Sequence, residues 1–417
     1  MEKLKPSEII KWIGISSLVV SSYMFLGGFH VGPISLRLLV SYGLLGYTLL
    51  RGKKGYQSTK GIETYFIFLA FYIFISILNL TAFRPSFTKD LIAVHFVCLT
   101  AIIAFPRFFK TEASIRGAYI VLVLIFLFNA FVTYLQFNNS PLGWSLGMSI
   151  NPTELENLAV RQTYMETGDE FQESILMGIM GTPVGNGYFV ATLLPIVTCF
   201  IWGKFGLKTI WTSVLFVIGV FCVYMIQQRM ALVVTAIYIV TILVLKKKNF
   251  FSIVFFIIVA FVLAELSQGF DVSGMGRLSN VNDAYRTWTF SVLNDFLGDP
   301  RQVLLGYRRV NPEVDIFVFR TMGHTTFLDA LRRGGIFLLL VYIVLFFRLC
   351  RELVGIVRFS RRVKDYRTLG MALGCLCFLL YSQTHSTGVQ SGSILFWTLF
   401  MLTVQSYRLK CEALDAT

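Results

Sequence analysis

The stretch from Gly117 to Phe137 reads GAYIVLVLIFLFNAFVTYLQF and contains no charged side chain. As an α-helix with a rise of 1.5 Å per residue, this stretch would be about 31 Å long. The hydrocarbon core of a bilayer is about 30 Å thick, so the segment is long enough to cross it. The stretch therefore predicts a transmembrane helix.

Apolar segments of similar length recur along the whole chain. Of its 417 residues, 55% are hydrophobic and only 14% are charged, whereas soluble domains have about 25% charged residues. We therefore predict an all-α polytopic membrane protein in which residues 1–417 form a single transmembrane domain. The pattern predicts about twelve transmembrane helices, at residues 9–28, 31–50, 62–82, 90–106, 117–137, 181–203, 208–226, 229–245, 250–267, 326–348, 368–385 and 389–406.

The positions of lysine and arginine predict the orientation in the membrane. These residues outnumber aspartate and glutamate by 37 to 23, and 24 of the 37 lie in the segments predicted to share a side with both termini. Cytoplasmic segments carry such an excess, so both termini are predicted to be cytoplasmic. The basic residues form no separate domain with stacking aromatic side chains, and nucleic acid is therefore not expected as a partner.

Two connections on the opposite, outer side are long, and long ordered loops are where function usually lies. Residues 138–180 form an acidic loop with six carboxylates and one arginine. Those carboxylates match no metal-ligand pattern, so no metal site is predicted. Residues 268–325 form an arginine-rich loop that is predicted to be partly helical; its arginines are Arg277, Arg286, Arg301, Arg308, Arg309 and Arg320.

Arginines on the outer side run against the charge bias and need an explanation. Arg229 lies in a short outer turn at membrane depth, where an unpaired guanidinium is costly. Arg286 begins a predicted amphipathic helix that stops at Asp299-Pro300. Each could be an interfacial or solvated charge. The alternative is that these planar, always-charged groups bind a phosphate or a pyrophosphate.

Two histidines near the outer ends of helices are candidates for a proton acceptor. His324 stands just before the predicted helix 326–348, at the end of the arginine-rich loop. His385, at the outer end of the predicted helix 368–385, is its rival. A histidine can accept a proton near neutral pH. The neighbouring arginines favour His324 as the functional one.

A glycine-rich segment, GTPVGNG at residues 181–187, superficially suggests a phosphate-binding loop. It lacks the Gly-Lys-Ser/Thr ending and the preceding strand of a nucleotide site. We interpret it as a helix start built of small residues, where a ligand can approach the backbone closely.

The order and spacing of these residues resemble the bacterial O-antigen ligase and Wzy-type O-antigen polymerase superfamily of membrane glycosyltransferases. The family usually has asparagine after the histidine and an acidic residue before the glycine, where this chain has Thr325 and Arg333. The resemblance covers about residues 175–345. Its features are, in order, the glycine-rich segment with Asn186, then Arg229, Arg286 with Trp288, Asp299-Pro300 with Leu305-Gly306-Tyr307, and His324 with Leu328 and Gly334-Gly335.

The resemblance implies transfer of a glycan from undecaprenyl pyrophosphate to an acceptor hydroxyl at the periplasmic face of the bacterial inner membrane. It implies no metal or nucleotide cofactor. Arg229 and Arg286 would bind the donor pyrophosphate and His324 would be the catalytic base. The partners would be this donor, a glycan or lipid A-core acceptor, the lipid bilayer and, as a possible further partner, a chain-length regulator. Supporting candidates for the site are Asn186, Arg320 and Trp288.

Two products are compatible with these residues, a polymer of repeat units and a glycan ligated to lipid A-core. We favour the polymerase, because the first loop is acidic and the residues flanking the histidine are altered. A flippase or polysaccharide exporter is the alternative of another class. It predicts charged residues along a path through the membrane, yet residues 117–137 have none. The absence of an internal repeat also argues against a transporter built from two related halves.

Overall fold

The computed structural model describes most of the chain and shows an all-α membrane protein. The described residues are 5–24, 30–31, 34–50, 58–79, 87–88, 91–150, 176–203, 206–226, 228–245, 296–307, 325–384 and 388–415. In the first half they form α1 (Pro6–Met24), α2 (Leu36–Leu50), α3 (Lys60–Leu78), the π-helix η2 (Leu91–Phe96), α5 (Val97–Phe108), α6 (Glu112–Phe137), α7 (Pro141–Ile150), α9 (Pro183–Val197) and η5 (Cys199–Trp202). In the second half they form α10 (Leu207–Ile226), α11 (Arg229–Leu245), α15 (Pro300–Leu305), α17 (Thr326–Val363), α18 (Tyr366–Tyr381), η7 (Ser382–Thr384), η8 (Val389–Ser391) and α19 (Ile394–Asp415). Strands β1 (His30–Val31) and β2 (Ile34–Ser35) pair in an antiparallel ladder before α2.

Each predicted transmembrane segment except 250–267 overlaps a helix, and 250–267 lies outside the described residues. Within the described part of the chain, four helices are long and apolar enough to cross a membrane by length and composition. They are α3, the continuous helix Leu91–Phe108, α6 and α10. The number of membrane crossings and the orientation remain predictions.

Several helix boundaries differ from the sequence prediction; α19, for example, continues to Asp415 and does not end at residue 406. Helix α17 does not end at residue 348 but continues to Val363. Its last part is rich in arginine, which ends the apolar run but is a good helix former. Helix α7 occupies residues that were predicted to belong to the acidic loop 138–180. It begins at Pro141, and proline is favoured in the first helical position.

Polar side chains fix where several helices begin, because the first backbone N–H groups of a helix have no partner within it. Thr111 and Ser114 form a reciprocal capping box at the start of α6. Side-chain oxygens also accept hydrogen bonds from the first turn at other helix starts, at Thr59 for α3, Thr182 for α9, Asp299 for α15, Thr325 for α17 and Asp365 for α18.

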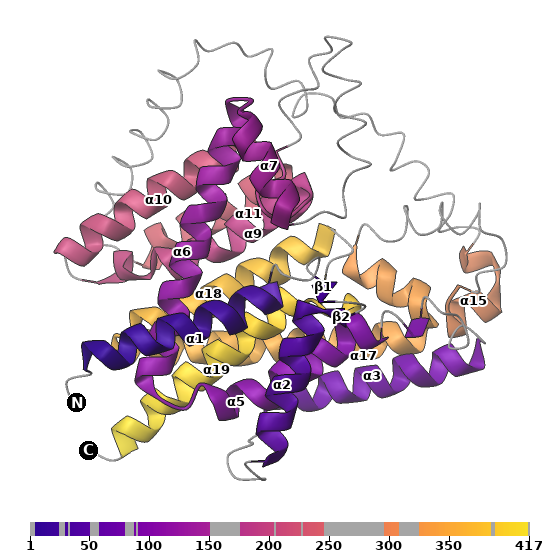
Figure 1. The fold of residues 1–417 in the computed structure, drawn as a ribbon. Helices are drawn as coiled ribbons and strands as arrows, with labels where there is room; N and C mark the ends of the chain where they lie inside the picture. The colour runs from indigo at the N-terminus through magenta and orange to yellow at the C-terminus, as the bar shows by residue number, and fades with distance from the viewer. Residues whose placement is uncertain are drawn as a thin grey trace.

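Helices α3 and α17 lie side by side along their length (Figure 1). Near the start of α3, the Gly61 N–H donates to Glu352 Oε1 at 2.8 Å, and Arg348 Nη1 donates to Thr64 Oγ1 at 3.1 Å. Further along α3, Tyr72 meets Arg333. The two helices are therefore antiparallel. Buried aromatic side chains join this pair to α19, among them Tyr65, Phe68, Tyr342 and Trp397.

Helix α17 is broken near its start. Gly334 and Gly335 have non-helical backbone angles, and Gly335 has a φ of 65°. Residues with a side chain rarely adopt this left-handed region, whereas glycine does so without steric cost. The break separates a short first part, residues 326–333, from the long part that follows. The candidate functional residues lie on and around this first part.

Candidate functional site

The short helix α15 docks on the break in α17 by direct backbone contact (Figure 1). A Cβ atom on Gly335 would overlap the Leu304 carbonyl, so only glycine permits this approach. After α15, Gly306 turns with a φ of 84°, and the Tyr307 N–H donates to the Arg332 carbonyl at 2.7 Å. The two glycine-containing motifs, separated by more than twenty residues in sequence, are thus in contact.

Apolar packing and one further hydrogen bond hold the same region. Phe296 is buried against Leu331 on the first part of α17, with Leu328 beside them. From α3, the Asn79 side-chain amide donates to the Leu305 carbonyl. The described part of the arginine-rich loop therefore packs against α17 and is hydrogen-bonded to the end of α3.

Asp299-Pro300 was predicted to stop a helix, and the structure gives it a second role. A helical turn at residues 296–298 does end before Asp299. However, Asp299 also caps α15, since its carboxylate accepts from the Arg301 N–H at 2.9 Å, and Pro300 is the first residue of that helix. Aspartate followed by proline is a favourable way to begin a helix.

A buried ionic cluster, consisting of Asp329, Arg332 and Arg333, lies on the first part of α17. Arg332 Nη2 donates to Asp329 Oδ1 at 2.5 Å, and Arg333 Nε donates to Asp329 Oδ2 at 2.8 Å. The Asp329 side chain is fully buried, and that of Arg333 is 15% exposed. Gln390, near α19, also donates to Asp329 Oδ2, at 3.3 Å. The cluster thus places two guanidinium groups on one carboxylate.

Arg333 also faces α3. Its Nη1 lies 3.5 Å from the Tyr72 hydroxyl, and its guanidinium carbon lies 6.0 Å from the centre of the Tyr72 ring. Tyr72 packs in turn against His95, which is buried and accepts or donates a hydrogen bond with Tyr65 at 3.1 Å. His95 is therefore a core residue that is paired within the protein.

The ends of four other elements meet close to the start of α17. The Thr326 hydroxyl donates to Gln383 Oε1 in η7 at 2.8 Å. Just before η7, Tyr381 ends α18, and its hydroxyl donates to the Val184 carbonyl in α9 at 3.4 Å. Gln228, directly before α11, lies close to Gly187 in α9, since a Cβ atom on that glycine would come within 3.0 Å of the Gln228 side chain. The starts of α9, α11 and α17 therefore gather around the end of α18.

Asn186 lies in a buried hydrogen-bond network between α6 and α9. Its Oδ1 accepts from Asn129 Nδ2 at 2.8 Å, and its Nδ2 donates to Thr133 Oγ1 at 3.1 Å and to the Leu176 carbonyl at 3.0 Å. The side chain is fully buried. This geometry gives Asn186 a role in holding the start of α9 in place. Both polar atoms of its amide are engaged by protein groups.

Thr325 and Arg333 are the two departures from the family pattern, and the structure gives each a local role. The Thr325 side chain accepts from the Leu328 N–H at 3.1 Å and so caps α17. Threonine is a favoured residue at this capping position. Arg333 pairs with Asp329, four residues earlier on the same helix face.

The remaining predicted site residues lie outside the described residues. These are His324, Arg286, Trp288, Arg320 and the rival His385. Arg229 is the first residue of α11, so its backbone position is known while its side chain is not described. The structure therefore locates the helix starts that carry or follow Arg229 and His324, and the roles of those side chains remain predictions.

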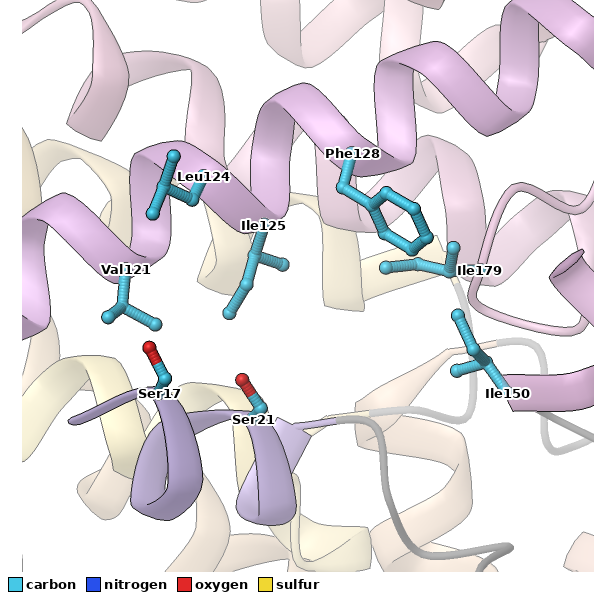
Figure 2. Close-up of a pocket in the computed structure, with 8 residues that line it drawn as sticks. All are labelled: Ser17, Ser21, Val121, Leu124, Ile125, Phe128, Ile150 and Ile179. Carbon is cyan, nitrogen blue, oxygen red and sulfur yellow. The ribbon is translucent and has the colours of Figure 1, made fainter. Parts of the chain in front are cut away.

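A groove of about 300 Å³ lies between α1 and α6. Figure 2 shows Ser17 and Ser21 on α1 facing apolar side chains of α6, with Ile150 and Ile179 at one end. The groove opens outward, since Leu124 and Phe128 are partly exposed. Ile179 also links the groove to the Asn186 network, because its N–H donates to Asn129 Oδ1 at 2.9 Å.

Sequence reasoning missed the Asp329 cluster. Its signal is present in the sequence, because carboxylate and arginines stand at spacings of three and four residues, which place them on one helix face. The apolar residues around them made this segment look like an ordinary transmembrane span.

In comparisons with known proteins, no family model and no curated protein matches the sequence.

Proposed function

We propose that the chain is a membrane glycosyltransferase that uses a glycan linked to undecaprenyl pyrophosphate and acts at the periplasmic face of the bacterial inner membrane. One observation carries the proposal: motifs that are far apart in sequence meet in space. The Asp299–Tyr307 segment lies on the Gly334–Gly335 break, and the starts of α9, α11 and α17 gather around the end of α18. These are the elements that carry the ordered features of the family resemblance.

The chemistry requires few groups. The acceptor hydroxyl attacks the anomeric carbon of the donor glycan, and the bond between that carbon and the pyrophosphate oxygen breaks. Negative charge develops on the pyrophosphate, and cations placed there stabilise the transition state. Arg229 and Arg286 take this role. His324 accepts the proton from the acceptor hydroxyl, and undecaprenyl pyrophosphate is the second product.

The prenyl chain of the donor remains in the bilayer, against the helices. The groove between α1 and α6 supports this part of the proposal, since its lining is mostly apolar and it opens outward. One end of the groove lies at Ile179, next to the Asn186 network and the start of α9. A chain in the groove would therefore leave its headgroup near the helix starts described above.

The most direct test uses purified protein in liposomes that contain undecaprenyl-pyrophosphate-linked repeat units. A polymerase converts these units into longer lipid-linked chains without any other protein. Acceptance of lipid A-core in place of a second repeat unit would instead indicate ligation. Movement of the intact donor across the bilayer, with no new glycosidic bond, would contradict the proposal and indicate a flippase.

A deletion strain gives an independent readout of the product. If polysaccharide ladders are lost while one repeat stays attached to lipid A, the protein is a polymerase. If all attached repeats are lost, it is a ligase. An unchanged polysaccharide in the deletion strain would argue against both.

A further inference from the structure

Arg333 is a cation that the proposed reaction does not yet use. It is the last residue before the α17 break, and the start of that helix directly follows His324. Its Nε is held by Asp329, and its Nη1 faces the Tyr72 hydroxyl. Both contacts fix the plane of the guanidinium. A fixed planar fork is the geometry with which arginine binds phosphate groups.

The charges of the cluster do not require this arginine for structural balance. A fully buried carboxylate needs a partner, because an isolated buried charge is strongly destabilising. Arg332 already meets that need, with both Nε and Nη2 donating to Asp329 Oδ1. Neutralising Asp329 takes one guanidinium, and the segment has two.

The two arginine side chains differ in their exposed fraction. The Arg332 side chain is 7% exposed and that of Arg333 is 15% exposed. Both side chains are largely buried, and Arg333 has the larger exposed fraction of the two. Its position next to the docked α15 also places it beside the described part of the arginine-rich loop.

We propose that Arg333 is a further donor-binding residue, which contacts a phosphate oxygen of a prenyl pyrophosphate while Asp329 and Tyr72 hold its guanidinium in place. This inference rests on the proposed function, because it assigns the anion to the lipid-linked donor. It also explains why a basic residue stands where the family usually has an acidic one. Here the positive charge serves the ligand, and the acidic residue that orients it is Asp329.

The test measures binding of undecaprenyl pyrophosphate to the full-length protein in nanodiscs of neutral phosphatidylcholine. Arg333→Gln should weaken binding about tenfold or more, the usual effect of losing a hydrogen bond to a charged group. Since Arg332 remains, this variant leaves Asp329 paired. Arg333→Lys keeps the charge but loses the fork, so its affinity should lie between those of the wild type and Arg333→Gln.

Arg348 provides a matched control. It is on the same helix and also bonds to a hydroxyl on α3, but it lies toward the opposite end of α3, at Thr64. Arg348→Gln should keep wild-type affinity. The inference is overturned if Arg333→Gln binds like the wild type, if Arg348→Gln loses as much affinity, or if the wild type does not bind the lipid. Competition with inorganic pyrophosphate shows whether the headgroup alone is recognised, and Arg333→Gln should weaken that competition as well.

The same nanodiscs separate this inference from the proposed enzyme activity. If the wild type binds the prenyl pyrophosphate through Arg333 but forms no glycosidic bond, the binding site stands and the glycosyltransferase proposal fails. If the wild type transfers glycan while Arg333→Gln binds the donor normally, the enzyme proposal stands and the role of Arg333 is wrong.

Discussion

Replacing Gly335 by alanine should destabilise the protein and release α15 from α17. Two costs follow from the structure. A residue with a side chain at a φ of 65° and a ψ of −163°, a combination that is essentially restricted to glycine, costs about 1–3 kcal/mol. The new Cβ would also overlap the Leu304 carbonyl, and forcing atoms into a packed site costs about 1–3 kcal/mol. If both costs apply in full, the free energy of unfolding falls by about 2–6 kcal/mol.

Gly355 on the same helix is the control, because a Cβ there meets no other atom within 4 Å. Alanine at an exposed helical position is favoured over glycine by about 0.5–1 kcal/mol, so Gly355→Ala should be neutral or slightly stabilising. The measurement is thermal unfolding of both purified variants in the same detergent. Equal unfolding temperatures for Gly335→Ala and Gly355→Ala would refute the reasoning about the helix break.

Three further predictions address the site and the topology. Arg286→Ala should abolish transfer at normal membrane abundance and Arg286→Lys should restore it only partly, because lysine cannot bind bidentately; wild-type turnover in the alanine variant would exclude the role. His324→Gln should lower turnover roughly 100-fold or more while donor binding survives. If that variant has normal turnover and His385→Ala is inactive, the base is His385. A cysteine at position 160 or 310 should react with an impermeant reagent in intact spheroplasts, and failure of both to react would reject the predicted orientation.

The positions of most helices could be predicted from the sequence, because a membrane span needs a long apolar run and little else. Residues 117–137 lie within α6, and residues 229–245 coincide with α11. Helix ends were less predictable where the end of an apolar run was not the end of the helix. The apolar run of α17 stops near Arg348, but the arginine-rich continuation is also helical up to Val363.

The individual motifs of the site could be predicted from the sequence, but the contacts between them could not. The sequence marks Gly334-Gly335 and Leu305-Gly306-Tyr307 as unusual, but their contact depends on backbone angles that no local pattern reveals. The Asp329 cluster was missed because a transmembrane span is expected to be uncharged. Charged groups within such a span are stable only when they are paired, as Asp329 is.

The amide network at Asn186 bears on how the chain assembles after insertion. Asn129 lies in the middle of a long apolar helix, and lipid offers its amide no hydrogen-bond partner. Its partner Asn186 is on α9, which leaves the ribosome later. The α6 helix would therefore enter the bilayer with an amide whose partners, the Ile179 N–H and the Asn186 side chain, are synthesised later. Hydrogen bonds between membrane helices contribute about 0.6–2 kcal/mol each, so this pairing gives the two helices a preference for each other that apolar packing alone would not supply.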